Sequence, residues 1–247
     1  SLFACFKAGC GAVPINFRLH PKEFAFIVDH SESRALIISP EFDAAVAGVR
    51  DQIPRVQHVI AVSGAREGAM DYASLLSAES EQFHDEDVAG EEVAWMFYTS
   101  GTTGFPKGAQ LTHRGCVSNL LNMAFAGAST QLATARATGE MPPEEAPVPV
   151  GLITTPLFHV TANNCAAYLI TAAGGKIVLM YRWDAGEALK LVEIEKVTAM
   201  SGVPIMAREL INHPDFEKTD TSSLATLGGG GAQLPPDLVQ KIDSTVA

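Results

Sequence analysis

Apolar and polar positions alternate along the chain in two rhythms, one typical of helices and one typical of strands. Pro21 begins a segment of helical spacing, and Pro suits the first turn of a helix. Within this segment Phe24, Ile27 and Val28 share one helix face. A short apolar run at 34–38 follows and predicts a buried strand. The two rhythms repeat along the chain, which predicts an α/β fold with largely parallel sheets flanked by helices.

The same pattern predicts a longer series of elements. Helices are expected over residues 1–9, 44–51, 114–126, 162–172, 184–196 and 235–246, and strands over 56–62, 93–97, 148–155 and 176–180. Segments at 198–201, 203–211 and 224–227 complete the series. Asp184 and Glu187 have the spacing of a capping box at the start of a helix. A polar, acidic linker at about 77–92 suggests a subdomain break.

The segment at 98–108, with the sequence YTSGTTGFPKG, directly follows the strand predicted at 93–97. Its small residues, among them Gly101 and Gly104, allow backbone N–H groups to crowd around an anion. Lys107 supplies a cation for a polyphosphate. Four hydroxyl groups add hydrogen-bond donors, those of Thr99, Ser100, Thr102 and Thr103. We interpret the segment as a phosphate loop, because an ordinary Gly/Thr-rich surface turn has no use for so many donors and a lysine.

The spacing excludes two common phosphate loops. A Walker loop places Gly directly before its Lys, whereas Pro106 precedes Lys107 here. The dinucleotide fingerprint G-x-G-x-x-G is also absent from this segment.

Composition narrows the class of protein. The chain has 247 residues, of which 47% are hydrophobic and 18% charged, enough to bury one large core or two small ones. Its formal net charge of −11 argues against binding to nucleic acid, which needs clustered Lys and Arg. Because ATP is also an anion, a site for it here must act through local donors rather than through the overall field.

The four cysteines, Cys5, Cys10, Cys116 and Cys165, lack CxxC pairing and metal-ligand spacing with His. They are interpreted as buried thiols of a reducing compartment. No apolar run approaches the length of a membrane span. We therefore expect a cytoplasmic protein.

The loop at 98–108 resembles the signature loop of the adenylate-forming superfamily, which includes acyl-CoA synthetases, luciferases and adenylation domains. Three other stretches agree with this family in the same order along the chain. Residues 7–16 resemble its K-x-G…P-x-N segment, and residues 156–159 (PLFH) resemble the segment lining its acid pocket. Residues 230–234 (GGAQL) resemble its adenine-binding G-G-A-P-L turn. Within the family the chain resembles the acyl-CoA synthetases and fatty-acid-CoA ligases.

The resemblance implies a reaction in two steps. A carboxylate attacks the α-phosphorus of ATP and expels pyrophosphate, and the thiol of coenzyme A then opens the acyl-adenylate to a thioester. Lys107 and His159 are the implied catalytic residues. The implied nucleotide-binding residues are Thr99, Ser100, Gly101, Thr102, Thr103, Gly104, Lys107, Gly230, Gly231 and Ala232. Mg²⁺ is expected with the ATP, although its ligands in this chain are unknown.

Two of these assignments have structural alternatives. His159 is expected between the acid pocket and the α-phosphate, where it would orient the carboxylate or gate the thiol channel, but a lone His is also compatible with a hydrogen-bonded core residue. The glycines at 228–231 also suit a flexible linker. Val160, Thr161, Asn163 and Asn164 follow His159 and either line the pocket or serve helix packing.

The residues near His159 indicate part of the substrate class. Amino-acid-activating members of the family place an Asp near the position of His159, where this chain has Phe158, His159 and Val160. This difference favours a fatty or aryl acid, without setting its length. The sequence does not decide whether the acyl acceptor is coenzyme A or a carrier protein. It is also compatible with a homo-oligomer. The alternatives to a ligase are a luciferase-like oxidation and a nucleotide-binding module without catalysis.

The ends of the chain suggest part of a larger protein. Residue 1 falls within a predicted helix, and the sequence stops where the family continues toward its Mg²⁺-binding Glu and its small C-terminal domain. We expect a partial N-terminal AMP-binding domain that is inactive alone. The Pro- and Glu-rich stretch at 130–149 is predicted as a mobile loop, better interpreted as a surface excursion than as a lid over the acid pocket.

Overall fold

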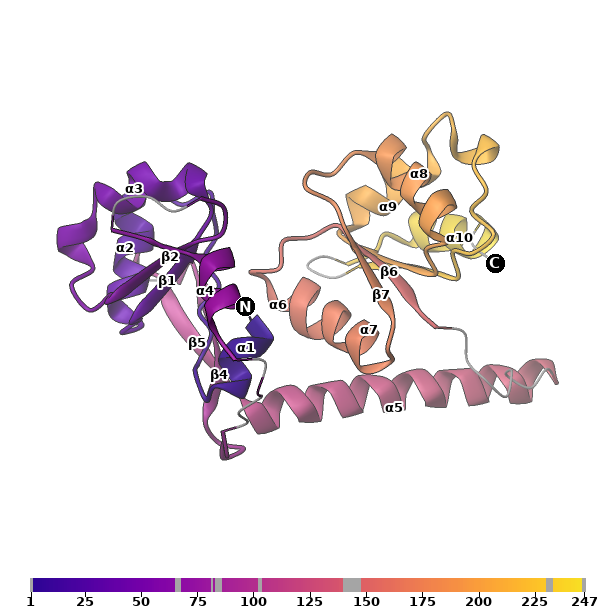
Figure 1. Ribbon diagram of the computed structural model, residues 1–247. Coiled ribbons are helices and arrows are strands. Elements are labelled where there is room, and N and C mark those ends of the chain that lie inside the picture. The colour runs from indigo at the N-terminus through magenta and orange to yellow at the C-terminus, as the bar shows by residue number, and fades with distance from the viewer. Residues whose placement is uncertain are drawn as a thin grey trace. The chain divides into compact units, whose positions relative to one another are not determined.

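The computed structural model describes residues 2–64, 68–80, 82, 86–101, 104–139, 148–229 and 233–245. The chain forms two compact units, residues 1–115 and 116–247 (Figure 1). The subdomain break predicted near 77–92 lies within the first unit and stays a prediction.

The first unit combines a parallel sheet with an antiparallel pair of strands. Its helices are α1 (Leu2–Lys7), α2 (Pro21–His30), α3 (Asp43–Ala47) and α4 (Tyr72–Ala78), with 3₁₀ turns at Pro40–Phe42 and Arg50–Gln52. Its strands are β1 (Ala35–Ile38), β2 (His58–Ala61), β3 (Met70–Asp71), β4 (Val93–Thr99) and β5 (Lys107–Thr112). Strands β1, β2 and β3 pair in parallel in that order, and β4 pairs antiparallel with β5.

The β1–β2–β3 sheet is covered by apolar side chains from α2 and α3. Ala25 and Val28 come from α2 and Val46 comes from α3, with Phe24 partly buried against them. Of the predicted helix face, Ile27 is buried but lies outside this cluster. The cluster packs against Ile38 and Val59 of the sheet. Burial of this face, at roughly 25 cal/mol per Å² of apolar surface, is the main force that holds α2 on the sheet.

Strand β4 forms the centre of the other sheet. Trp95 is fully buried and lies edge-on to Phe6 of α1, with 4.9 Å between ring centroids. The backbone of Ala12 extends the sheet on the other side of β4, because its N–H donates to Ala94 O at 2.8 Å and its carbonyl accepts from Met96 N–H. Both neighbours of β4 therefore hold it in place as it leads into the loop.

Helix α5 (His113–Thr138) corrects the prediction for the stretch at 130–149. The helix continues to Thr138 instead of ending near 126, because Ala is abundant in this part of the chain and has the highest helix propensity. Gly139, at φ +77°, follows its last residue. Residues 140–147 lie outside the described residues, so the predicted loop is wrong for 130–138.

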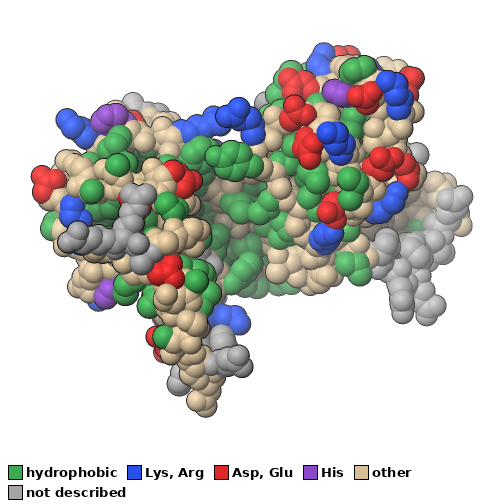
Figure 2. Space-filling model, turned by 45° about the horizontal axis from the view of Figure 1, so that its top comes forward, with side chains coloured by type: hydrophobic (Ala, Val, Ile, Leu, Met, Phe, Trp, Pro, Cys, Tyr) green, Lys and Arg blue, Asp and Glu red, His purple; other side chains and the backbone are tan. Residues whose placement is uncertain are grey.

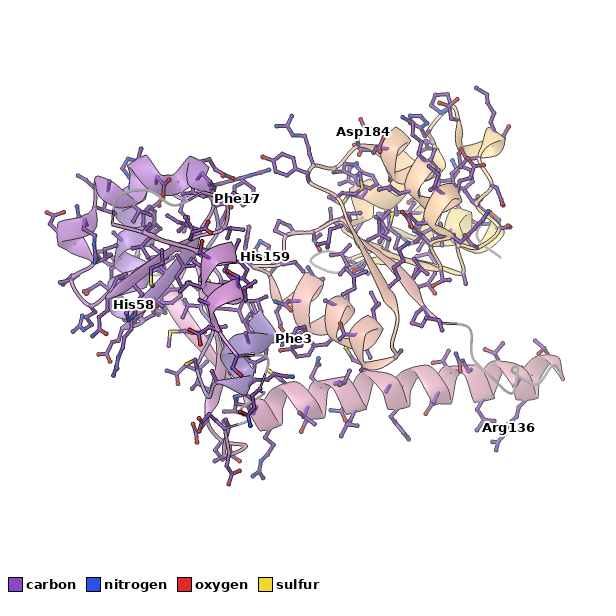
Figure 3. The ribbon with its side chains drawn as sticks, viewed as in Figure 1. Phe3, Phe17, His58, Arg136, His159 and Asp184 are labelled. Carbon is purple, nitrogen blue, oxygen red and sulfur yellow. The ribbon has the colours of Figure 1, made fainter. Side chains whose placement is uncertain are left out.

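The second unit contains a four-stranded parallel sheet with the order β7-β6-β8-β9. Its strands are β6 (Val150–Ile153), β7 (Lys176–Leu179), β8 (Ala199–Gly202) and β9 (Thr226–Gly229). Its helices are α6 (Val160–Ala162), α7 (Tyr168–Ala172), α8 (Ala185–Glu195), α9 (Pro204–Ile211) and α10 (Pro236–Thr245), with a π-helical segment at Asn163–Ala167 and a 3₁₀ turn at Phe216–Lys218. Asp184 caps α8 by accepting from Glu187 N–H at 2.8 Å, as its spacing predicts (Figure 3).

Helices cover both faces of this sheet. Side chains alternate between the two faces with period two, so a strand can contribute apolar residues to both. Leu152, Val178 and Met200 are paired in register and point toward the cluster built by α8, α9 and α10. Ile153, one residue further along β6, points to the opposite face and packs on Ala162. The predicted α/β class, with largely parallel sheets flanked by helices, is confirmed.

The structure also bears on the predictions for the cysteines and for membrane spans. The cysteines are unbridged, but Cys10 is exposed and only Cys116 is fully buried, so the interpretation of all four as buried thiols is wrong. Within the described part of the chain, the helices are too short or too polar to cross a membrane.

Candidate functional site

The predicted phosphate loop connects two antiparallel strands, whereas a Walker loop leads from a strand into a helix. Thr99 ends β4 and is paired with Lys107, the first residue of β5. The sequence analysis missed β5, because its sequence, KGAQLT, lacks a run of apolar residues. Between the paired ends, Ser100 and Gly104 are exposed. Thr102 and Thr103 lie outside the described residues.

Glycine is required at two positions of this loop. Gly101 has φ +61°, and a Cβ there would lie 2.6 Å from the carbonyl oxygen of Phe105. Gly104 has φ +94°, with open space around its missing Cβ. Both backbone conformations are costly for other residues. The tight turn at Gly101 brings the backbone of the loop close together, as an anion-binding loop requires.

Lys107 is exposed at the end of the loop. Within the described ranges its ammonium group has neither an acidic partner nor a hydrogen-bond acceptor, unlike Lys176, which pairs with Glu195. An exposed ammonium group beside hydroxyl-bearing Thr99 and Ser100 makes this end of the β4–β5 hairpin suited to a phosphate.

An aromatic cluster from α2 supports the loop from one side. We call Phe26, His30, Tyr98 and Phe105 the loop anchor. Tyr98 Oη lies 2.7 Å from His30 Nδ1, and the Phe26 ring is stacked on the His30 ring at 5.2 Å. Phe105, at the tip of the loop, reaches the Phe26 ring at 5.4 Å. Burial raises the pKa of Tyr98, so its hydroxyl stays protonated at neutral pH.

His159 lies at the N-terminal end of α6, in the connection that follows β6 (Figure 3). Its side chain is exposed, so the alternative of a core histidine is wrong. Its backbone is fixed on both sides, because its N–H donates to Pro156 O and its carbonyl accepts from Asn163 N–H. Its ring lies 4.6 Å from that of Phe158.

The strand order explains why the position of His159 suits a ligand site. From β6 the chain moves to β7 at one edge of the sheet, and from β8 it moves to β9 at the other edge. The neighbours β6 and β8 therefore define a topological switch point, and ligands of open parallel sheets bind at the carboxyl ends of such strands. His159 follows β6 at this edge.

Two threonines that the sequence analysis missed line the switch point. Thr154 Oγ1 donates to Ser201 O at 2.9 Å, which joins the ends of β6 and β8. A Cβ on Gly202 would lie 2.8 Å from the same Oγ1. Thr155 Oγ1 is buried without a partner among the described residues, and an unpaired buried hydroxyl is a candidate ligand group. Thr154 and Thr155 lie at the carboxyl end of the strand predicted at 148–155. That position was the sequence feature that could have identified them as site residues.

Asn163 and Asn164 belong to a π-helical segment, a form often found at functional sites. Both are buried. Asn163 Nδ2 donates to Leu157 O at 3.1 Å and so fastens the loop that carries His159. Asn164 Nδ2 reaches Cys116 Sγ at the start of α5. These contacts assign packing and positioning roles to the two residues.

The predicted adenine turn lies mostly outside the described residues, since these exclude Gly230, Gly231 and Ala232. Strand β9 leads into it, so it begins at the same carboxyl edge as the connection that carries His159. A Cβ on Gly228 would meet no described atom within 4 Å. The parallel sheet therefore brings His159 and the entrance of the glycine turn to one edge, with β8 between their strands.

Basic and acidic side chains lie close to one another in the second unit. On the face shown in Figure 2, basic and acidic side chains are interspersed over the second unit. Several are paired, for example Lys196 with Asp220 at 2.8 Å. Among the described residues, His, Cys, Asp and Glu form no group of three that could hold a metal ion.

Parallel sheets flanked by helices, a glycine-dependent loop between β4 and β5, and a topological switch point between β6 and β8 define an α/β protein with a sheet edge suited to a ligand. The model of the family described as AMP-binding enzyme matches residues 1–247. The chain therefore belongs to the AMP-binding enzyme family.

Its relatives include CoA ligases of aryl and fatty acids. A feruloyl-CoA synthase of an Amycolatopsis species is 34% identical over 98% of this chain and 43% of the relative. A long-chain-fatty-acid–CoA ligase of Thermus thermophilus is 31% identical over 95% of this chain and 41% of the relative. The chain thus spans less than half the length of these relatives.

Solved structures agree on the fold. A long-chain-fatty-acid-CoA ligase (FadD1) from Archaeoglobus fulgidus matches with a TM-score of 0.77 and 26% identity, over 99% of this chain and 45% of that one. The anthranilate CoA ligase AuaEII, in complex with anthranoyl-AMP, matches with a TM-score of 0.81 and 21% identity, over 99% of this chain and 45% of that one. At 21% identity the second likeness concerns the fold alone.

Proposed function

We propose that the protein to which this chain belongs activates a carboxylic acid with ATP to an acyl-adenylate and then forms an acyl-CoA thioester, with release of AMP. The observation that carries this proposal is Lys107, which is exposed beside the glycine-dependent turn and has no ion-pair partner among the described residues, in a chain that the AMP-binding family model matches throughout. The curated relatives named as CoA ligases support it.

The first step brings together two anions, so the site must neutralise phosphate charge and align the attack. We assign the β- and γ-phosphates to the loop from Thr99 to Gly104 and to Lys107. Its N–H and hydroxyl groups would donate to the phosphate oxygens, and the Lys107 ammonium group would stabilise the departing pyrophosphate. The loop anchor would hold these donors in place before ATP binds.

The second group of residues would receive the acid and the adenosine. We assign the carboxylate to the neighbourhood of His159, whose exposed ring would donate a hydrogen bond to it. Thr155 Oγ1, which is buried without a described partner, is a second candidate donor at this edge. Gly230, Gly231 and Ala232 are assigned to the adenine ring, where small residues allow close approach to the backbone.

The donor types of the loop suit phosphate and not a bare metal ion. They are hydroxyl groups, N–H groups and a lysine, whereas Mg²⁺ takes carboxylate, phosphate and water oxygens. Mg²⁺ would therefore be bound mainly through the ATP phosphates, where it neutralises charge.

A fatty or aryl acid is the proposed substrate class. Phe158, 4.6 Å from the His159 ring, places an apolar surface beside the proposed carboxylate site. An acidic residue for a substrate ammonium group is absent from 154–164. The relatives named for feruloyl and long-chain fatty acids point to the same class.

The proposal is tested by calorimetric titration of this chain with a non-hydrolysable acyl-adenylate, in octanoyl and benzoyl forms. We expect saturable binding, a preference between the two acyl groups, and weaker binding by Lys107→Ala. Equal affinity for both acyl-adenylates and for AMP would support a nucleotide-binding module and contradict acid activation.

A further inference from the structure

Helix α1 ends in a Schellman motif, and the two positions that this motif brings together are both cysteines. Gly9 has φ +63°, and its N–H donates to Phe6 O at 3.1 Å. The N–H of Cys10 donates to Cys5 O at 2.7 Å. These two bonds define the motif, in which side chains at the positions of Cys5 and Cys10 commonly touch.

The backbone hydrogen bond sets an upper limit on the separation of the two residues. With 2.7 Å between Cys10 N and Cys5 O, standard bond lengths limit the Cα–Cα distance to about 6.6 Å. Disulfides span Cα–Cα distances of about 4.4–6.8 Å. The turn therefore holds the Cα atoms of Cys5 and Cys10 no further apart than a disulfide can span.

The two thiols differ in accessibility and also interact. Cys10 is exposed, with its Sγ 3.5 Å from Ala8 O, whereas Cys5 is half-buried. Burial, followed by the charge of a Cys10 thiolate, raises the pKa of Cys5. An effect of one sulfur on the other requires that they lie close together. Cys10 is thus the more accessible thiol for a reagent from solvent, and Cys5 is the less accessible one.

We propose that Cys5 and Cys10 form a dithiol site that reacts with small disulfides of the oxidised-glutathione class and closes into an intramolecular disulfide. The site is independent of the proposed function. Cys116 is buried against Asn164, and Cys165 lies beyond it in the π-helical segment, so neither has a thiol partner at a comparable turn.

The reaction proceeds by two exchange steps. The Cys10 thiolate attacks one sulfur of oxidised glutathione, which forms a mixed disulfide on Cys10 and releases one glutathione thiolate. The Cys5 thiolate then attacks Cys10 Sγ, which forms the Cys5–Cys10 bond and releases the second glutathione thiolate. The two protein thiols lose two electrons to the glutathione disulfide, and their protons pass to the two released thiolates.

The bond would close directly before a segment that contacts β4. Ala12 follows Cys10 by two residues and is hydrogen-bonded to both Ala94 and Met96 of that strand. Oxidation would therefore fasten α1 to the residues that hold β4, the strand that leads into the phosphate loop.

The test is mass spectrometry of the native chain after incubation with oxidised glutathione, alkylation of the remaining thiols and digestion with trypsin. Cleavage after Lys7 separates Cys5 from Cys10, so we expect peptides 1–7 and 8–18 to be joined by a reducible bond. The Cys5→Ser variant should instead accumulate the glutathione adduct on Cys10. The Cys165→Ser variant, as a matched control, should give the same joined peptides as the native chain.

Two comparisons separate the folded turn from simple sequence proximity. Unfolding the chain in urea, or straining the turn with Gly9→Val, should lower the ratio of joined peptides to adduct by about tenfold, because the effective concentration of Cys5 at Cys10 falls. A stable adduct on Cys10 of the native chain, with Cys5 still free to alkylate, would overturn the proposal. An equal ratio in the folded and unfolded chain would overturn it as well.

Discussion

Lys107 is the residue on which the proposed phosphate site depends most. It is exposed opposite Thr99, at the point where β4 and β5 leave the loop. We predict that Lys107→Ala weakens ATP and pyrophosphate binding by about 1.5–3 kcal/mol, the value of a hydrogen bond to a charged group. Calorimetry with pyrophosphate measures this loss. Lys22→Ala, which removes an exposed lysine of α2, should leave the affinity unchanged, and equal losses in both variants would contradict a specific contact.

Gly101 and Gly104 provide a matched pair for testing the loop backbone. Both have positive φ, but only a Cβ at Gly101 would collide with a backbone atom, Phe105 O at 2.6 Å. We predict that Gly104→Ala costs about 1 kcal/mol of stability through strain alone, and that Gly101→Ala costs more and weakens pyrophosphate binding as well. Urea unfolding and calorimetry measure the two effects. Equal losses in both would show that the turn at Gly101 is not required.

At the residue scale, the sequence predicted the loop better than the switch-point edge. The loop is recognisable because its glycines, hydroxyl groups and lysine all lie within one short stretch of sequence, 99–107. Thr154 and Thr155 were not predicted because their role depends on the pairing of β6 with β8. For Asn163 the sequence left pocket lining and helix packing open, because its contact with Leu157 is made only in the fold. Neither the strand pairing nor this contact is encoded in local spacing.

The loop anchor links α2 to the phosphate loop at the scale of elements. The Phe26 ring lies 5.4 Å from that of Phe105 and 5.2 Å from that of His30. We predict that Phe26→Ala lowers ATP affinity by about 0.5–1.5 kcal/mol, the value of an aromatic pair, because the loop loses its support. The measurement is calorimetry with ATP.

A double-mutant cycle provides the control for this prediction. If Phe26 acts through Phe105, the double variant should lose little more affinity than Phe105→Ala alone. Strictly additive losses would contradict the anchoring role.

The ion pair between Lys196, at the end of α8, and Asp220, which precedes β9, predicts that the stability of the fold depends on pH. Hydrogen bonds from Lys196 and Ser222, with the charge of Lys196, hold the pKa of Asp220 well below its usual range. A carboxyl group with a depressed folded pKa contributes its full stabilisation above its unfolded pKa, about 4, and this stabilisation is lost progressively as the pH falls from there through the lower folded pKa. We predict that Asp220→Asn flattens the acid limb of the stability curve, measured by urea unfolding at several pH values.

Removal of the partner is the control for Asp220. Lys196→Ala should flatten the same acid limb, because it deletes the largest cause of the low pKa. An acid limb unchanged in both variants would show that this ion pair is screened by solvent, as exposed pairs often are.

At the element scale, most helices and strands were predictable, and the exceptions have physical reasons. Strand β5 is defined by its pairing with β4 and not by its own apolar pattern. Helix α5 extends to Thr138 because Ala-rich sequence favours helix even beside a Pro-rich stretch. Strand β3 has only two residues, too few for any pattern to be visible.

At the scale of the whole molecule, the chain divides its proposed tasks between its two units. The first unit holds the phosphate loop, and the second holds the sheet edge with His159 and the entrance to the glycine turn. The order of these segments matches the sequence resemblance, and the family model spans both units. The curated relatives that the chain matches are more than twice its length.

The measurement that tests the central claim most directly is ATP–pyrophosphate exchange by the full-length protein, with fatty and aryl acids supplied in turn. The account predicts exchange that depends on the added acid and falls by about tenfold or more in Lys107→Ala, a change equivalent to at least 1.4 kcal/mol in the barrier. Exchange that is absent with every acid, while ATP still binds, would contradict acid activation.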